Sequence, residues 1–436
     1  METNGAMLQE AEPDAPHPLV AKLSVPPGER PTRDLWAALA FTSLALRSMW
    51  LAHGKPLPLG APSLPAAVAL ALGCVALAQA SLAAMLRWPV GFQRVACGTV
   101  AAAGLYAAFD PEEPSWWSLL PVVLMGLLYV ASTADGVLLQ LHQTACRVAL
   151  SHTPLSLVNA VSAVVTVCYL RLTLPMASDH PFLFAFGGLW FWLVASNVVA
   201  ATAVGVAARD FLGVAPTQTK VQRVAVAFSC AMTSFGSICF GSLFTAVGYI
   251  LSWAARAAAA PNKDDGLGAI IVKGMIRFFA MMFEEFVRRF GKYSLTNVAL
   301  TGNSFLEAAR DTAQLMEEHP HLEKIVAGHG MLPSIISALF TAVLVYPAVA
   351  AVTPAMAPLA ASLAMGLHFT AVSSVYEGFP TTVFLCSAEA QRARQSAAAA
   401  VADERHRELH ARLAQAAAVA AAEAEKKRLA EEKKTA

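Results

Sequence analysis

The amino-acid sequence predicts an all-α fold, that of a polytopic integral membrane protein with about ten transmembrane helices. Two features of the composition predict this class: 56% of the 436 residues are hydrophobic and only 14% are charged. The mean hydropathy is +0.53. A soluble globular chain has about 25% charged residues, so this chain lies outside that class. The lipid bilayer is therefore an expected partner.

Nine stretches approach the ~20 apolar residues that a helix needs to cross a bilayer. They are expected at about 35–52, 64–86, 92–109, 117–140, 155–174, 183–207, 225–252, 331–351 and 355–376. The connecting segments contain Pro or charged residues that would be costly in hydrocarbon. Basic residues fall in alternate connections and acidic residues in the others, which predicts a cytosolic N-terminus by the positive-inside rule.

Residues 253–330 break this alternation, because charged residues interrupt stretches that are only partly apolar. The segment 270–293, IIVKGMIRFFAMMFEEFVRRFGKY, is amphipathic and is expected to lie along the membrane surface. A tenth ordinary span is the alternative. An even total near ten would place both termini in the cytosol.

The two ends differ in composition from the apolar middle. Residues 1–34 are acidic and Pro-rich and are predicted to be a disordered cytosolic tail. Residues 35–387 form the predicted transmembrane domain. Residues 388–436 are rich in Ala, Glu, Lys and Arg and are predicted to form a charged, solvated helix. Their leucines do not sustain a heptad repeat, so a coiled coil is the less favoured alternative.

The segment SFGSICFGSL, residues 234–243, interrupts an apolar stretch with glycine and serine. On a helix, small residues three or four positions apart line one face. Four such residues are Ser237, Gly241, Thr245 and Gly248. In lipid, a face of this kind marks close packing between helices, with a substrate path as the alternative.

This segment resembles the GS(I/L)CFGSL signature of the choline transporter-like family of membrane proteins, solute carrier family 44. Three further blocks resemble the same family: GGLWFWLVASNVVAATAVGVAARD from residue 187, SLTNVALTGNSFLEAARDTAQLM from residue 294 and SVYEGFPTTVFLCSAE from residue 374. The resemblance extends from about residue 186 to residue 390. Two positions depart from it, because the family has Asp where this chain has Thr381 and Ala390.

The resemblance implies a multi-pass transporter of the plasma membrane. Its substrate would be choline or an ethanolamine-like amine, used in phosphatidylcholine synthesis, and residues 35–387 would be the transporter domain. Such transport needs no nucleotide hydrolysis, and the sequence contains no GxxxxGK(S/T) loop for ATP. We accordingly expect that the chain is not an enzyme and that it needs no cofactor.

A quaternary ammonium cannot donate a hydrogen bond, so its site is expected to offer aromatic faces. Trp190 and Trp192 are the first choice, together with Asn197, which follows Trp190 by about two turns on the same face. Tyr249 and Tyr376 are further candidate rings. For each ring, an anchor at the membrane interface or a packing role is the alternative.

Two other polar residues complete the candidate substrate site. Asp135 is a carboxylate within a predicted span, which is costly unless it is paired or faces water, and the alternative places it at the interface. Asn303, like Asn197, must find a partner, and its alternative role is to join two helices. The Glu and His residues between 317 and 329 and the seven cysteines lack the spacing of a metal site, so none is expected.

Other functions remain as alternatives. The net charge of +1 gives no basic excess, so no nucleic-acid partner is expected. Family members need not all move choline, which makes a channel-like or scaffolding membrane protein the alternative function. An integral membrane lipid enzyme comes third, because the sequence offers no ordered catalytic constellation. The sequence predicts neither ion coupling nor an oligomeric state.

Overall fold

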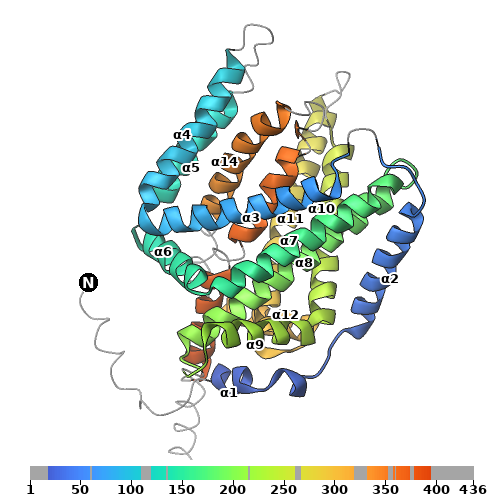
Figure 1. The fold of residues 1–436 in the computed structure, drawn as a ribbon. Helices are drawn as coiled ribbons and strands as arrows, with labels where there is room; N and C mark the ends of the chain where they lie inside the picture. The colour runs from blue at the N-terminus through green and yellow to red at the C-terminus, as the bar shows by residue number, and fades with distance from the viewer. Residues whose placement is uncertain are drawn as a thin grey trace, which may run out of the picture. The chain divides into compact units, whose positions relative to one another are not determined.

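The structure is a computed structural model, and it describes residues 18–58, 61–109, 119–133, 136–214, 217–260, 267–318, 331–351, 357–358, 360–373 and 378–393. Within these ranges every regular element is a helix (Figure 1), which confirms the predicted all-α class. The chain divides into two units between Cys386 and Ser387. The described part of the second unit ends at residue 393, so most of the predicted tail 388–436 lies outside the described residues.

The labelled helices are α1 Pro18–Ser24, α2 Leu35–Ala52, α3 Leu64–Arg87, α4 Pro89–Ala108, α5 Leu119–Thr133, α6 Gly136–Ser151, α7 Thr153–Thr173, α8 Pro181–Phe211, α9 Lys220–Thr233, α10 Phe235–Ala258, α11 Leu267–Thr301, α12 Phe305–Glu318 and α14 Met331–Ala350. Short 3-10 turns are η2 Pro27–Glu29 and η4 Leu174–Met176. Helical segments also cover 360–373 and 378–393.

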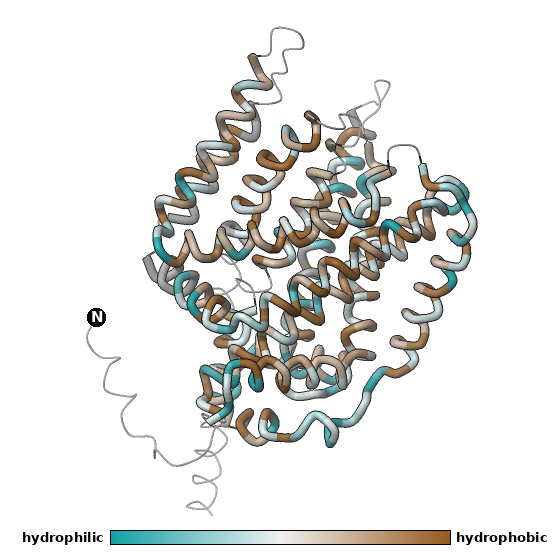
Figure 2. Tube along the Cα trace, in the orientation of Figure 1, coloured by the Kyte–Doolittle hydropathy of each residue, from teal (hydrophilic) through white to brown (hydrophobic). Residues whose placement is uncertain are grey.

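Five of the described helices are long and apolar enough to cross a membrane by length and composition: α2, α3, α7 (with η4), α8 and α10. Figure 2 shows hydrophobic residues along these helices and a mostly hydrophilic segment where α1 leads into α2. The predicted total of about ten spans stays a prediction.

One predicted span is wrong as a continuous helix. For the expected span 117–140, the structure describes α5, which ends at Thr133, and α6, which begins at Gly136, and residues 117–118 and 134–135 lie outside the described residues. The expected span 225–252 is divided at Ser234 between α9 and α10. The stretch 225–252 contains no charged residue on either side of Ser234, so hydropathy alone does not mark this break.

A long-range contact accounts for the break between α9 and α10. A Cβ atom at Gly236 would collide with the backbone carbonyls of Arg33 and Asp34, so the chain before α2 lies directly against the start of α10. α9 has its own N-terminus, with a capping box between Thr219 and Gln222. The predicted span therefore consists of a short separate helix followed by α10.

The C-terminal part of α11, from about residue 284, runs antiparallel to α10. A Cβ atom at Gly241 would lie 2.8 Å from Leu295 Cδ2, and one at Gly248 would lie 2.6 Å from Val287 Cγ1. These glycines let the two backbones approach closely, which is how helices associate in lipid. Contacts with α10 are made by residues 284–293, whereas residues 270–279 are mostly exposed. The expectation that 270–293 lies along the membrane surface stays a prediction.

Residues 18–34 fold over one end of the helices, near α9 and α12 in Figure 1. We call them the N-terminal strap. Leu19 and Leu23 of α1 are each 2% exposed, and α1 packs against α11. The predicted disordered tail 1–34 is thus wrong for residues 18–34, because two leucines one turn apart give even this polar segment an apolar face to bury.

Candidate functional site

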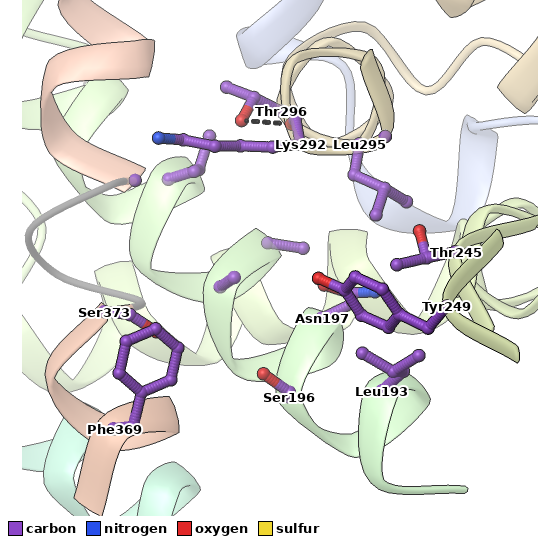
Figure 3. Close-up of a pocket in the computed structure, with 15 residues that line it drawn as sticks. Leu193, Ser196, Asn197, Thr245, Tyr249, Lys292, Leu295, Thr296, Phe369 and Ser373 are labelled. Carbon is purple, nitrogen blue, oxygen red and sulfur yellow. Dashed lines mark hydrogen bonds between the residues drawn. The ribbon is translucent and has the colours of Figure 1, made fainter. Parts of the chain in front are cut away.

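A cavity of about 190 Å³ lies between α8, α10 and α11, beside the helical segment 360–373 and Gly378 (Figure 3). The lining residues are Leu193, Ser196, Asn197, Ala200, Ala201 and Val204 of α8, Thr245 and Tyr249 of α10, Gly291, Lys292, Leu295 and Thr296 of α11, and Phe369, Ser373 and Gly378. The residues on each helix recur at intervals of three or four, so each helix turns one face toward the cavity.

Amide and hydroxyl groups make part of the wall polar. The amide nitrogen of Asn197 donates to Ser242 Oγ at 2.8 Å, which joins α8 to α10. The hydroxyls of Thr245 and Thr296 each donate to the carbonyl four residues earlier in their own helix, at 3.0 Å. A hydroxyl that donates in this way can still accept a hydrogen bond. The wall therefore offers oriented acceptors.

The wall also contains two aromatic rings and one cationic side chain. Tyr249 and Phe369 come from α10 and from segment 360–373, and Figure 3 shows them at opposite sides of the cavity. The Lys292 Nζ atom lies 5.8 Å from the centroid of the Tyr293 ring. Among the described residues that line the cavity, none is Asp or Glu.

The part of the chain that builds this cavity also matches known proteins. A family model described as plasma-membrane choline transporter matches residues 180–392, a range that includes every residue lining the cavity. Residues 180–392 therefore resemble the choline transporter-like family. The resemblance predicted from the sequence is thereby confirmed.

A curated relative is Protein PNS1 from Debaryomyces hansenii, to which the chain is 31% identical over 138 residues. The matched part represents 30% of this chain and 26% of the relative's length. The chain therefore matches only about a quarter of the length of that relative.

Asn197 and Tyr249 are the predicted substrate contacts that line the cavity of this choline transporter-like region. Trp190 does not line it. Its side chain is 4% exposed, its indole N–H donates to the Cys239 carbonyl at 3.1 Å, and its ring packs edge-on against Phe41. Trp190 and Asn197 both face α10, as their spacing predicts, but only Asn197 reaches the cavity.

Trp192 lies on another side of α8. Its indole N–H donates to Thr370 Oγ1 at 3.0 Å, and its ring fills the space that a Cβ atom would need at Gly366. It lines a separate, mostly apolar groove of about 370 Å³ between α3, α7, α8 and segment 360–373. Residues two positions apart on a helix point about 200° apart, so Trp190 and Trp192 do not meet at one site.

Asn303 lies in the connection between α11 and α12. Its side-chain amide donates to Asp311 Oδ2 at 3.3 Å, and its backbone N–H donates to Thr301 Oγ1 at 3.2 Å. The structure therefore places Asn303 away from the cavity. Asp135 and Tyr376 lie outside the described residues.

The small residues of α10 face several neighbours. Thr245 lines the cavity, and Ser237 donates to Asp34 Oδ2 at 2.8 Å. Gly241 lies against α11 and α12, and Gly248 lies against α11. One face of α10 thus combines helix packing with a share of the cavity wall.

Sequence reasoning missed five polar or aromatic residues of the wall: Ser196, Lys292, Thr296, Phe369 and Ser373. A signal was present for two of them, because Lys292 and Thr296 lie one turn apart on the face of α11 that also carries Gly291 and Leu295. The charge of Lys292 instead indicated a surface face. Within the described residues, no group of three or more His, Cys, Asp or Glu side chains could hold a metal ion.

Proposed function

We propose that this chain is a membrane transporter that moves choline or a closely related amine, such as ethanolamine, across the plasma membrane. We place the cavity between α8, α10 and α11 on the path of that substrate. One observation carries the proposal: the range that matches a family described as plasma-membrane choline transporter includes the whole cavity wall.

The wall suits a small cation that carries a hydroxyl group. The charge of a quaternary ammonium is spread over methyl groups, which interact with ring faces for about 0.5–2 kcal/mol each. Tyr249 and Phe369 supply rings on two sides of the cavity. The hydroxyl oxygens of Thr245 and Thr296 are acceptors for the hydroxyl of choline. Asn197, held by Ser242, is the proposed polar contact of α8.

Lys292 limits how tightly a cation can be held. Its side chain belongs to the same wall, and like charges repel one another more strongly in a desolvated site than in water. A carrier must bind its substrate well enough to admit it and weakly enough to release it. We infer that Lys292 keeps the affinity for choline low and so favours release.

The remaining predictions enter the proposal with adjusted roles. Trp190, Trp192 and Asn303 are proposed to join helices, because each donates a hydrogen bond to a neighbouring residue away from the cavity. Transport is proposed to follow gradients, without a cofactor and without catalysis. Both tails are proposed to be cytosolic, with residues 35–387 as the transporter domain. A channel-like or scaffolding role is the less favoured alternative, because the polar wall with two rings serves no purpose in assembly alone.

The direct test measures the uptake of labelled choline by vesicles that contain the purified full chain. Empty vesicles give the background, and unlabelled choline or ethanolamine added as a competitor reports selectivity. We expect saturable choline uptake above the background. Vesicles with folded protein and no saturable uptake of either amine would overturn the proposal.

Tyr249→Leu tests whether the cavity takes part. Removing one ring face should raise the apparent KM for choline about tenfold, whereas Tyr249→Phe should retain most of the affinity. Tyr346, which is 49% exposed on α14 and does not line the cavity, provides the matched control Tyr346→Leu. An equal apparent KM in Tyr249→Leu and Tyr346→Leu would exclude a contact between the substrate and the Tyr249 ring.

A further inference from the structure

We propose that the N-terminal strap, residues 18–34, is a latch that holds one end of the cavity-lining helices together and must release for substrate to pass that end. This proposal rests on the proposed transport function. It follows from which helices the strap joins, how few side chains hold it, and how near its contacts lie to the cavity.

Asp34 is the main connection between the strap and α10. Its Oδ2 atom accepts hydrogen bonds from Ser237 Oγ at 2.8 Å and from the Phe305 backbone N–H at 3.0 Å. Asp34 occupies the N-cap position of α2, yet its side chain makes no capping bond to α2. One carboxylate thus joins the start of α2 to the starts of α10 and α12, through bonds of the stronger, charge-assisted kind.

Two buried guanidinium groups join the strap to the other two cavity-lining helices. Arg30 is 6% exposed and donates to the Ala299 carbonyl of α11 at 3.4 Å. Arg209 of α8 is 2% exposed and donates to the Leu23 carbonyl of the strap at 3.3 Å. Burial lowers the pKa of the Arg30 guanidinium.

These contacts lie close to the cavity. Eight residues separate Ser237 from Thr245, which corresponds to about 12 Å along α10. On α11, the cavity residue Thr296 precedes Ala299 by three positions, less than one turn. α8, α10 and α11 cannot separate at this end of the cavity while the strap joins all three.

The strap has few contacts that would prevent its release. Leu19, Leu23 and Arg30 are its buried residues among those whose exposure is described, and most of the others are exposed. Asp34 has a left-handed backbone, with φ of 52°, which costs a non-glycine residue energy that release would recover. α1 has seven residues, too few for a helix that is stable by itself, so a released strap would lose its order. Order–disorder transitions of this kind are a common way to switch a site.

A reversible crosslink tests the latch. The double variant Asp34→Cys/Ser237→Cys places a cysteine at each of two positions whose side chains are hydrogen-bonded in the wild-type chain. Oxidation should join the two cysteines in a disulfide. We expect oxidation to lower choline uptake about tenfold or more and a reductant to restore it, while each single variant responds to neither treatment. Uptake at an unchanged rate through fully crosslinked protein would overturn the latch. If the reduced double variant and the wild-type chain both take up no choline, the proposed function fails instead.

Amide hydrogen exchange tests the same proposal without any substrate. Asp34→Ala should accelerate exchange in residues 18–33 about tenfold, while α8 and α11 retain their wild-type rates. Glu29→Ala is the matched control, because Glu29 is an exposed acidic residue of the same strap. Unchanged exchange in the strap would contradict a latch held by Asp34. Equal acceleration in the strap, α8 and α11 would instead identify a structural anchor and would also overturn the proposal.

Discussion

α2 and α8 are both apolar enough to cross a membrane, but they occupy different positions in the bundle. In the most apolar part of each helix, 56% of the residues of α8 are buried, against 22% for α2. α2 has large exposed side chains such as Trp50, which is 76% exposed. α8 has glycines in contact with neighbouring helices: a Cβ atom at Gly205 would lie 3.1 Å from Ala227 Cβ.

The difference between α2 and α8 shows that apolarity and small residues have separate effects on where a helix lies. Apolarity places a helix in lipid, where other helices and lipid chains are about equally apolar and provide no preference between them. Small residues decide which helices lie in the centre, because they let backbones approach. The central helices α8, α10 and α11 also line the cavity. The helices that pack in the centre of the bundle are therefore the same helices that form the candidate site.

The strongest challenge to this comparison substitutes leucine for glycine at a central and at a peripheral position. Gly241→Leu should lower the free energy of unfolding by about 3 kcal/mol or more, because Phe305 Cε2 would lie 2.7 Å from the new Cβ atom. Gly73→Leu on α3 should be tolerated, because no atom lies within 4 Å of the equivalent position. Thermal unfolding in detergent measures both variants. Similar losses of stability in Gly241→Leu and Gly73→Leu would show that close packing of α10 contributes no more to stability than packing at the peripheral position.

A smaller effect is expected from a pair of tryptophans, one on each compared helix. Trp190→Leu should lower the free energy of unfolding by roughly 2 kcal/mol, because it leaves a void and removes the hydrogen bond from the indole to the Cys239 carbonyl. Trp50→Leu should change it by less than about 0.5 kcal/mol. Uptake assays add a second readout, since Trp190 does not line the cavity and its loss should leave the apparent KM for choline within roughly twofold. A large rise in KM at normal stability would place Trp190 on the substrate path.

Features of the fold and of the candidate site could be predicted from the sequence where neighbouring residues determine them, and could not be predicted where distant residues do. The helical periodicity and the apolar runs predicted α2, α3 and α8 to within a few residues, and the small-residue stripe predicted a face of α10 that packs closely. Asn197 and Tyr249 were identifiable as candidates because they are polar or aromatic groups within apolar spans, although the same reasoning also selected Trp190 and Trp192, which do not line the cavity. These features are local in the sequence.

The features that could not be predicted depend on contacts between distant segments. The break at Ser234 follows from the strap that lies against Gly236, about two hundred residues away in sequence from Arg33. Lys292 was interpreted as part of a surface helix because nothing in the neighbouring sequence shows that α11 pairs with α10. The separation of Trp190 from Trp192 could have been derived from helix geometry alone, since positions two apart face different ways.

The smallest expected effect concerns the charge in the wall. Lys292→Gln removes a positive charge and should strengthen choline binding by on the order of 1 kcal/mol, which lowers the apparent KM roughly fivefold. Lys292→Arg retains the charge and should leave the KM near its wild-type value. Uptake at several choline concentrations measures both variants. A higher KM for Lys292→Gln would mean that Lys292 assists the substrate, and the proposed cation would then have to be reconsidered.

The most direct test of the central claim, that the substrate passes through the cavity between α8, α10 and α11, is to fill the cavity. Ala200 lines it, and Ala185 lies on the same helix in the separate open groove next to Trp192. Choline uptake by vesicles that contain Ala200→Trp or Ala185→Trp is measured at equal amounts of folded protein. The account predicts that Ala200→Trp lowers uptake at least about tenfold while Ala185→Trp transports like the wild-type chain. Normal uptake by folded Ala200→Trp would contradict the account.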